Sequence, residues 1–456
     1  MKASIASLAT ALTLGASTVL GASIPEKRTS SVTSITVKGN AFFKGDDRFY
    51  IRGVDYQPGG SSKLADPIAD ADSCKRDIKK FQDLGLNTIR VYSVDNSADH
   101  DECMTALADA GIYLVLDYSL NRADPKQSYN DVYLQYIFAT VEKFAKYDNT
   151  LAFFSGNEVI NDGPSSSAAP YVKAVTRDIR AFLSGNKLRK VPVGYSAADI
   201  DTNRLEMAEY MNCGSDDERS DFFAFNDYSW CDPSSFQISG WDQKVKNFTG
   251  YGLPLFLSEY GCNTNTRKFE EVSALYSTKM TGVYSGGLVY EYSQESSNYG
   301  LVKISGDSVS ELPDYDALKT AFDGTKNPSG NGDYNSTGGA SGCPVKSAPN
   351  WDVEGDSLPA IPTPAKKYLT QGAGKGVGFS GKGSQTSGTQ STSTSVSGSD
   401  SSSGSGSSTS SSSSGTSTST NGASAGLKPS AMSFAPVAVG LVTALSSVFG
   451  ASLLFL

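Results

Sequence analysis

LAFFSGNE, residues 151–158, is a short apolar run that ends on an Asn–Glu pair. It is followed by PYVKAVTRDIRAFLSGN (170–186), whose apolar residues recur at the i, i+3, i+4 spacing of an amphipathic helix. Gly185 near its end is a typical helix stop. A second apolar run, VPVGYSAAD (191–199), comes next. Together these stretches predict one strand–helix–strand unit.

The same alternation repeats between about residue 45 and residue 295. Eight runs rich in β-branched and aromatic residues are strand candidates: 48–56, 86–94, 112–119, 151–158, 191–199, 222–230, 253–261 and 286–293. Eight β–α units in roughly 250 residues predict a closed (β/α)₈ TIM barrel. The alternative is an open doubly wound sheet, which usually carries a Gly-rich phosphate loop after its first strand. The stretch GVDYQPGGSS (53–62) is not such a loop.

Composition excludes several kinds of site. The formal net charge is −9 and no basic tract occurs, which argues against a nucleic-acid partner. The only histidine, His100, opens an expected helix, where we predict a surface or capping role. A single histidine excludes multi-histidine metal sites, and any His-based triad would have to use His100. The sequence implies no cofactor, no metal and no protein partner.

Two glutamates end strands that should open into the same mouth of the barrel. Glu158 ends the fourth predicted strand, and Glu259, in FLSEYG (256–261), ends the seventh. Functional side chains of such barrels come from the carboxyl ends of the strands. Glycoside cleavage needs two carboxylates flanking one bond, and a separation of about 5–5.5 Å gives a nucleophile and a retaining reaction. The alternative is that these are two unrelated surface glutamates.

Three further residues could support Glu259. Arg90 and Tyr92 lie two residues apart on the second predicted strand, so they face the same side. A buried arginine near Glu259 would keep that carboxylate ionised. Tyr228, at the end of the sixth predicted strand, could donate a hydrogen bond to it. For each of the three, ordinary barrel packing or surface pairing is the alternative.

Several stretches resemble the fungal β-1,3-glucanosyltransferases, family 72 of the glycoside hydrolases. They are IRGVDYQPGGSS (51–62), NTIRVYSVD (87–95), FFSGNEV (153–159), FNDYSW (225–230), LSEYGC (257–262) and YEYSQESSNYGLV (290–302). The resemblance implies that an internal β-1,3-glucan bond is cleaved. The new reducing end stays on the enzyme as a glycosyl ester until the non-reducing end of another β-1,3-glucan takes it up. Donor and acceptor glucan chains are therefore the expected partners.

The resemblance also assigns roles to residues. Glu158 would be the acid/base and Glu259 the nucleophile, while Asn157 would hydrogen-bond the 2-hydroxyl of the sugar. Seven residues fall in the sugar-binding motifs: Gln57, Tyr92, Asp117, Asn157, Tyr228, Tyr290 and Tyr299. Whether Tyr290 or Tyr292 faces the groove stays open.

Features of the chain ends predict secretion. Residues 1–22 resemble a signal peptide, and the sequons at Asn247 and Asn335 fit a glycoprotein. In an oxidising compartment the six cysteines would form three disulfides, for which 15 pairings exist. Topology together with the family resemblance implies Cys74–Cys103, Cys213–Cys343 and Cys231–Cys262. Cys343 is the only cysteine beyond the predicted barrel, so the cysteine-rich carbohydrate-binding module of some family members is not expected.

The rest of the chain divides into four predicted segments. The catalytic barrel would span residues 30–325, and an extension tied by Cys343 would span 326–369. A disordered Ser/Thr-rich stalk is expected over 370–421, because 24 of the 30 residues from Ser391 to Thr420 are Ser or Thr. Residues 422–456 would be a removed glycolipid-anchor (GPI) signal.

The terminal apolar run, FAPVAVGLVTALSSVFGASLLFL (434–456), is long enough for a transmembrane helix, which is the alternative. No Lys or Arg follows it to hold such a helix in place. We expect Asn421 to be the attachment residue, with Gly422 and Ser424 as rivals. The protein would then act on the outer face of the plasma membrane or in the cell wall.

Two other functions stay open at this point. One is a retaining β-1,3-glucan hydrolase on the same barrel, which would use the same carboxylates but pass the intermediate to water. The other is an anchored wall protein that only binds glucan, against which the presence of both Glu158 and Glu259 argues.

Overall fold

A computed structural model describes residues 32–61, 64–117, 125–381 and 394–395. The predicted signal peptide (1–22), the anchor signal (422–456), Asn421 and most of the predicted stalk lie outside these residues. Among the described residues, no helix has both the length and the apolar character needed to cross a membrane.

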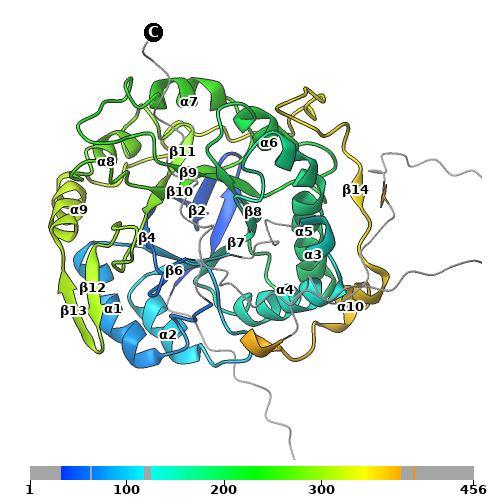
Figure 1. Cartoon of the computed structure of the whole chain (residues 1–456), viewed down its shortest axis with the longest axis horizontal. Coiled ribbons are helices and arrows are strands. Elements are labelled where there is room, and N and C mark those ends of the chain that lie inside the picture. Colours follow the sequence, from blue (N-terminus) through cyan, green and yellow to red (C-terminus); the bar gives the residue numbers. More distant parts are fainter. Residues whose placement is uncertain (1–31, 62–63, 118–124, 382–393, 396–456) are drawn as a thin grey trace, which may run out of the picture. The chain divides into compact units, whose positions relative to one another are not determined.

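Eight parallel strands close into a barrel in the order β10-β11-β4-β5-β6-β7-β8-β9, at the centre of the molecule (Figure 1). The strands are β4 (Ile51–Asp55), β5 (Thr88–Val91), β6 (Tyr113–Asp117), β7 (Thr150–Asn157), β8 (Val193–Ala198), β9 (Phe222–Asp227), β10 (Leu255–Tyr260) and β11 (Tyr284–Val289). Each predicted strand is present, and β7 and β11 begin earlier than predicted. The predicted (β/α)₈ barrel is therefore confirmed.

Helices surround the strands (Figure 1). The α-helices are α1 (Ala71–Asp83), α2 (Asp101–Asp109), α3 (Pro125–Ser128), α4 (Asp131–Phe144), α5 (Ala169–Gly185), α6 (Arg204–Met211), α7 (Trp241–Phe248), α8 (Glu271–Leu275), α9 (Pro313–Gly324) and α10 (Tyr368–Gln371). The described residues also form the short 3₁₀ turns η1 (Pro164–Ala168), η2 (Thr363–Ala365) and η3 (Gly378–Ser380). Side-chain caps fix two starts: Asp70 accepts from the first backbone amides of α1, and Asn130 does so for α4.

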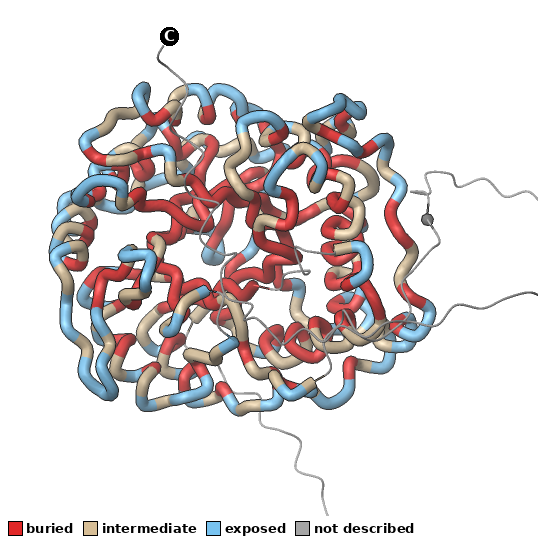
Figure 2. The backbone as a smooth tube through the Cα atoms, in the orientation of Figure 1, coloured by how far each residue is buried: buried red, intermediate tan, exposed pale blue. Residues whose placement is uncertain are grey.

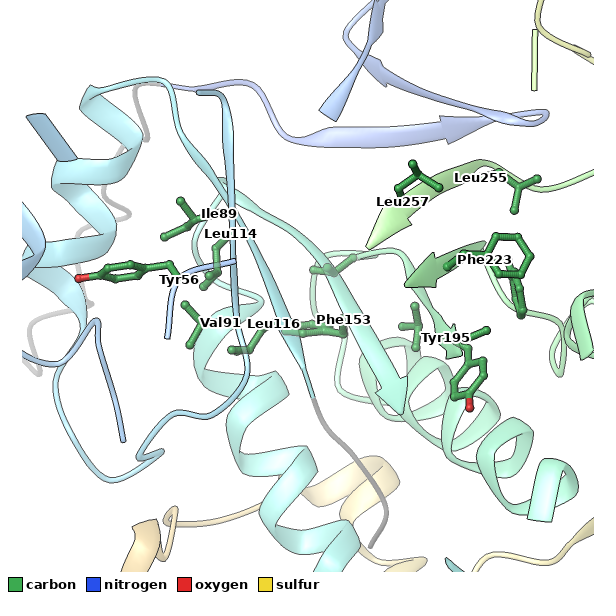
Figure 3. Close-up of a cluster of buried hydrophobic side chains, with 14 of the residues drawn as sticks. Tyr56, Ile89, Val91, Leu114, Leu116, Phe153, Tyr195, Phe223, Leu255 and Leu257 are labelled. Carbon is green, nitrogen blue, oxygen red and sulfur yellow. The ribbon is translucent and has the colours of Figure 1, made fainter. Parts of the chain in front are cut away.

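The apolar core has two parts. Outward-facing strand residues pack against the helices, and Figure 3 shows members of this cluster such as Val91, Leu116 and Phe153. A smaller cluster fills the barrel interior and includes Phe154, Phe222 and Phe256. Buried residues are accordingly concentrated in the strands and on the inner sides of the helices (Figure 2).

A small sheet that we did not predict precedes the barrel. It consists of β1 (Ile35–Lys38), β2 (Ala41–Lys44) and β3 (Asp47–Phe49). Phe42 of β2 is fully buried in the interior cluster, with its ring 6.0 Å from that of Phe222 and 5.9 Å from that of Phe256. Because Phe222 and Phe256 lie near the starts of their strands, this sheet closes the amino-terminal end of the barrel. The predicted strand 48–56 is thus wrong as one element, since β3 ends at Phe49 and β4 begins at Ile51.

The chain after the barrel stays on its surface. A hairpin of β12 (Val302–Ser305) and β13 (Ser308–Glu311) precedes α9, and β14 (Leu358–Pro359) pairs with β15 (Thr394–Ser395). Beyond α10, Gly378 donates its amide to Asn96 Oδ1 at 2.8 Å, and Ala373 is buried. The packed chain therefore continues to η3, so the predicted stalk boundary at residue 370 lies too early. Short-range packing of this kind leaves no periodic signal in the sequence.

The structure contains three disulfides, Cys74–Cys103, Cys213–Cys343 and Cys231–Cys262. These are the pairs that topology and the family resemblance implied. Cys213–Cys343 ties the extension to the end of α6, where Trp351 is fully buried against the ring of Tyr210.

Candidate active site

Glu158 and Glu259 both lie at the carboxyl end of the barrel. Glu158 directly follows β7, and Glu259 is the penultimate residue of β10. Asn226 of β9 donates to Glu158 Oε1 at 2.9 Å, and its Cα is the register partner of Glu259. Glu158 has a φ of +49°, a conformation that is uncommon for a residue other than glycine and that clusters at functional sites. The structure therefore brings the two predicted carboxylates to one mouth of the barrel.

Three donors hold Glu259. Oε1 accepts from the Tyr92 hydroxyl at 2.7 Å and from Arg90 Nη1 at 3.1 Å, and Oε2 accepts from the Tyr228 hydroxyl at 2.7 Å. Burial raises the pKa of Glu259 above its ordinary value, while Arg90 opposes that rise and the neighbouring carboxylate of Glu158 adds to it. This fixed, hydrogen-bonded carboxylate has the surroundings that a nucleophile needs.

Arg90 is the centre of the charged cluster. Its guanidinium is fully buried, and besides Glu259 it donates to Asp117 Oδ2 at 2.6 Å and to the Ser258 carbonyl at 3.0 Å. Burial alone would lower the pKa of Arg90, but Tyr92 and the surrounding carboxylates raise it well above its usual value. Arg90 is therefore cationic at every working pH. Asp117, which we expected among the sugar-binding residues, bonds to this guanidinium.

Three tyrosines form an aromatic wall beside Glu259. The ring of Tyr228 lies 6.2 Å from that of Tyr290 and 5.6 Å from that of Tyr299, and the latter two lie 5.3 Å apart. Tyr292 instead is buried behind the barrel wall, where its hydroxyl donates to Asp77 Oδ1 at 2.9 Å. Of the two alternatives left open by the sequence, it is Tyr290 that lies beside the candidate site.

Gln57 and Asn157 both form hydrogen bonds with other residues of the protein. Gln57 is 1% exposed, and it binds the Ala65 carbonyl at 2.7 Å and the amide of Tyr92 at 3.1 Å. Asn157 Oδ1 accepts from Ser196 Oγ at 2.8 Å and from Asn226 Nδ2 at 3.0 Å. These contacts position the strand ends, and Gln57 in particular fixes the backbone of Tyr92.

Sequence reasoning missed some residues of the site. Asn226 joins Glu158 to Asn157, and its Oδ1 accepts from Ser258 Oγ at 2.8 Å and lies 3.1 Å from Ser196 Oγ. All three lie in the last residues of barrel strands, so their position was a usable signal. Asp55, which ends β4 with Oδ1 3.8 Å from Arg90 Nη1, was not predicted either.

His100 does not have the role that we predicted. It precedes α2 but its side chain makes no capping bond, and it is 1% exposed, with Nε2 2.7 Å from Asp66 Oδ2. A buried position in contact with the Asp66 carboxyl group replaces the expected surface or capping one.

Comparisons with known proteins agree with this geometry. Residues 25–326 match the glucanosyltransferase family, glycoside hydrolase family 72. The chain is 77% identical to the 1,3-beta-glucanosyltransferase gel1 of Aspergillus fumigatus over the full length of both proteins. It is 53% identical to the 1,3-beta-glucanosyltransferase GAS5 of Saccharomyces cerevisiae, over 76% of this chain and 74% of that protein.

A similar solved structure is that of a glutamate-to-glutamine mutant of Saccharomyces cerevisiae Gas2p in complex with laminaritetraose and laminaripentaose. Its TM-score is 0.68 at 36% identity, over 74% of this chain and 76% of that one. The family match covers the barrel with both glutamates and the aromatic wall, and so the chain belongs to family 72 of the glycoside hydrolases, the glucanosyltransferases.

Proposed function

We propose that this protein is a β-1,3-glucan transglycosylase, in which Glu259 is the nucleophile and Glu158 the acid/base. One observation carries the assignment: Glu259 is held by Arg90, Tyr92 and Tyr228, while Glu158, beside it at the same barrel mouth, is bound by a neutral amide. The relatives named as 1,3-beta-glucanosyltransferases and the Gas2p complex with laminari-oligosaccharides support the substrate class.

The reaction would take two steps. Glu158 donates a proton to the oxygen of an internal β-1,3 linkage as Glu259 attacks the anomeric carbon, so that a glycosyl ester forms and the leaving chain departs with a new non-reducing end. Glu158, now a carboxylate, takes the proton from a hydroxyl at the non-reducing end of a second glucan. That oxygen attacks the ester, and Glu259 leaves as a carboxylate. Two inversions at one carbon retain the β configuration and elongate the acceptor.

The three donors to Glu259 have a definite task in this scheme. They hold the carboxylate in one orientation before the attack, and they accept its returning charge when the ester breaks. The rings of Tyr228, Tyr290 and Tyr299 offer flat apolar surface beside the reacting carboxylate, as sugar rings require.

Product length separates transfer from hydrolysis. A laminari-oligosaccharide of defined length is incubated with the purified protein, and the products are sized by chromatography. Products longer than the substrate are expected, whereas a hydrolase would give only shorter ones. Glu259→Gln should abolish turnover and still bind the oligosaccharide, because the amide keeps the shape of the side chain but is no nucleophile. Full activity of Glu259→Gln would exclude the mechanism.

Glu158→Gln gives an independent test of the acid/base role. Both steps should slow, because each needs a proton transferred at this position. An activated donor with a good leaving group needs no acid, so it should glycosylate Glu259 and leave a glycosyl ester that mass spectrometry detects on that residue. Absence of the ester in Glu158→Gln would contradict the assignment.

We also propose that the protein is secreted, N-glycosylated and held by a glycolipid at the outer cell surface. Asn247 is exposed on α7, and Asn335 is partly exposed in the extension, which suits both sequons. The predicted signal peptide, stalk and anchor signal support the rest. Release of the native protein from membranes by a phosphatidylinositol-specific phospholipase, and loss of mass on N-glycosidase treatment, are the expected results.

A further inference from the structure

Asp55 is a buried carboxyl group that the mechanism above does not use. It is the last residue of β4, at the same barrel end as the two glutamates, and it is 0% exposed. Neither of its oxygens has a hydrogen-bond partner among the described residues. An ionised carboxylate in that position would lose its hydration without gaining a donor in return, which is strongly unfavourable.

The groups that face Asp55 lie on five other barrel strands or on the segments that follow them. Its Oδ1 lies 3.8 Å from Arg90 Nη1, beyond hydrogen-bond distance, and its Cα is the register partner of Arg90. The charged and titratable groups that act on Asp55, or on which it acts, are Arg90, Tyr92, Asp117, Tyr228, Glu259, Tyr290 and Glu291. This set holds one cation and, with Asp55, four carboxyl groups.

Those four carboxyl groups are not equally provided with donors. Glu259 has three, and Asp117 has a short charged bond of 2.6 Å to Arg90. Glu291 accepts from Ser297 Oγ at 3.2 Å. Because a proton settles on the carboxylate whose charge is least stabilised, the donor count places it on Asp55. Burial raises the pKa of Asp55 well above its ordinary value, Arg90 opposes the rise, and Glu259, Glu291 and Asp117 add to it.

We propose that Asp55 is held in its neutral, protonated form and acts as a positioning residue that leaves the charge of Arg90 to Glu259 and Asp117. The proposal rests on the function proposed above only for what it says of Glu259 as nucleophile. An ionised Asp55 would compete with Glu259 for Nη1 of the same guanidinium, and it would also add a second negative charge near the nucleophile. A neutral Asp55 avoids both effects and fills the space beside Arg90.

Substitutions at Asp55 test this with the laminari-oligosaccharide assay. Asp55→Asn keeps the shape and is permanently neutral, so kcat/KM should stay within about threefold of the wild-type value. Asp55→Ala opens space beside the guanidinium and should lower kcat/KM by about tenfold or more. Retained activity in Asp55→Asn together with lost activity in Asp55→Ala is expected if the shape of the Asp55 side chain is needed and its negative charge is not.

The acid limb of the pH profile tests the charge of Asp55 separately from its shape. That limb reports the ionisation of Glu259 in the free enzyme. In Asp55→Asn it should lie within about 0.3 pH units of wild type, since no charge is removed. Asp117→Asn is the matched control on the same guanidinium. It removes an ionised carboxylate and should move the limb. An acid limb moved by about one pH unit or more toward lower pH in Asp55→Asn would show that Asp55 is ionised, and would overturn the proposal.

A measurement on the unmodified protein covers the case in which Asp55→Asn does not fold. Neutron diffraction after exchange into D₂O, at a pH where wild-type activity is maximal, should place a deuteron on an oxygen of Asp55. A bare carboxylate there would overturn the proposal. If the wild-type protein were inactive on glucan, the proposed function would fail, while the deuteron on Asp55 would still decide the proposal about its charge.

Discussion

Each donor to Glu259 makes a separable contribution, and Tyr228 is the most easily tested. Its hydroxyl donates to Oε2, whereas Arg90 and Tyr92 both donate to Oε1. Tyr228→Phe removes one bond to a charged acceptor and keeps the ring in the aromatic wall. A hydrogen bond to a charged group contributes about 1.5–3 kcal/mol. We therefore expect kcat/KM to fall by roughly 10- to 100-fold.

The same substitution should move the pH profile in a defined direction. Only ionised Glu259 can attack, so activity falls as the pH drops through its pKa. Because burial already raises that pKa above the ordinary value of 4.5, the wild-type acid limb should lie above pH 4.5. Losing the Tyr228 hydroxyl destabilises the carboxylate further and should shift the limb upward. Tyr292→Phe is the control, because its hydroxyl binds Asp77 and the limb should not move. Equal limbs in Tyr228→Phe and wild type would contradict this role.

At the scale of elements, the small sheet β1–β3 stabilises the barrel and takes no part in catalysis. Phe42 is fully buried among Phe154, Phe222 and Phe256, at the barrel end opposite to the two glutamates. Phe42→Ala should lower the free energy of unfolding by about 3–5 kcal/mol, measured by denaturant titration. The kcat of the folded fraction should stay near the wild-type value. A large loss of kcat without loss of stability would mean that this sheet communicates with the site.

This sheet also shows what local sequence reasoning missed. Two-residue turns, Gly39–Asn40 and Gly45–Asp46, join its strands, and both glycines have positive φ, which is the usual requirement of such hairpins. Both turn dipeptides can be read in the sequence, but we did not predict β1 and β2, and β3 was merged with the first barrel strand. The eight barrel strands were predictable because their apolar runs are separated by turns or helices at regular intervals.

The site was predictable only up to the strand ends. The positions of Glu158 and Glu259 follow from topology, since the carboxyl ends of barrel strands share one mouth. Which side chains then bond to one another depends on contacts across the barrel that no spacing encodes. Motif membership predicts Asp117 and Gln57 as sugar-binding residues, but it does not give their partners within the protein, which are Arg90 for Asp117 and the backbone of Tyr92 for Gln57. Asn226 lay inside a matching motif and was passed over for the same reason.

For the whole molecule, the disulfides differ in how much chain they close. Cys213–Cys343 spans 130 residues and fastens the extension, whereas Cys74–Cys103 spans 29 and joins neighbouring helices. In the chain-entropy account, a longer loop gives more stabilisation, about 4–5 kcal/mol for one near 100 residues. Replacing both Cys213 and Cys343 by Ser should therefore lower the free energy of unfolding more than replacing Cys74 and Cys103.

Limited proteolysis distinguishes loss of that tether from general unfolding. In the variant lacking Cys213–Cys343, Lys346 of the extension should become a preferred tryptic site. The barrel is expected to persist, because neither its eight strands nor its interior cluster includes this disulfide. The variant lacking Cys74–Cys103 is the matched control and should keep the extension protected. Equal protection of Lys346 in both variants would mean that packing around Trp351, which is buried against Tyr210, is sufficient to hold the extension. The disulfide would then stabilise the protein only by restricting the conformational freedom of the unfolded chain.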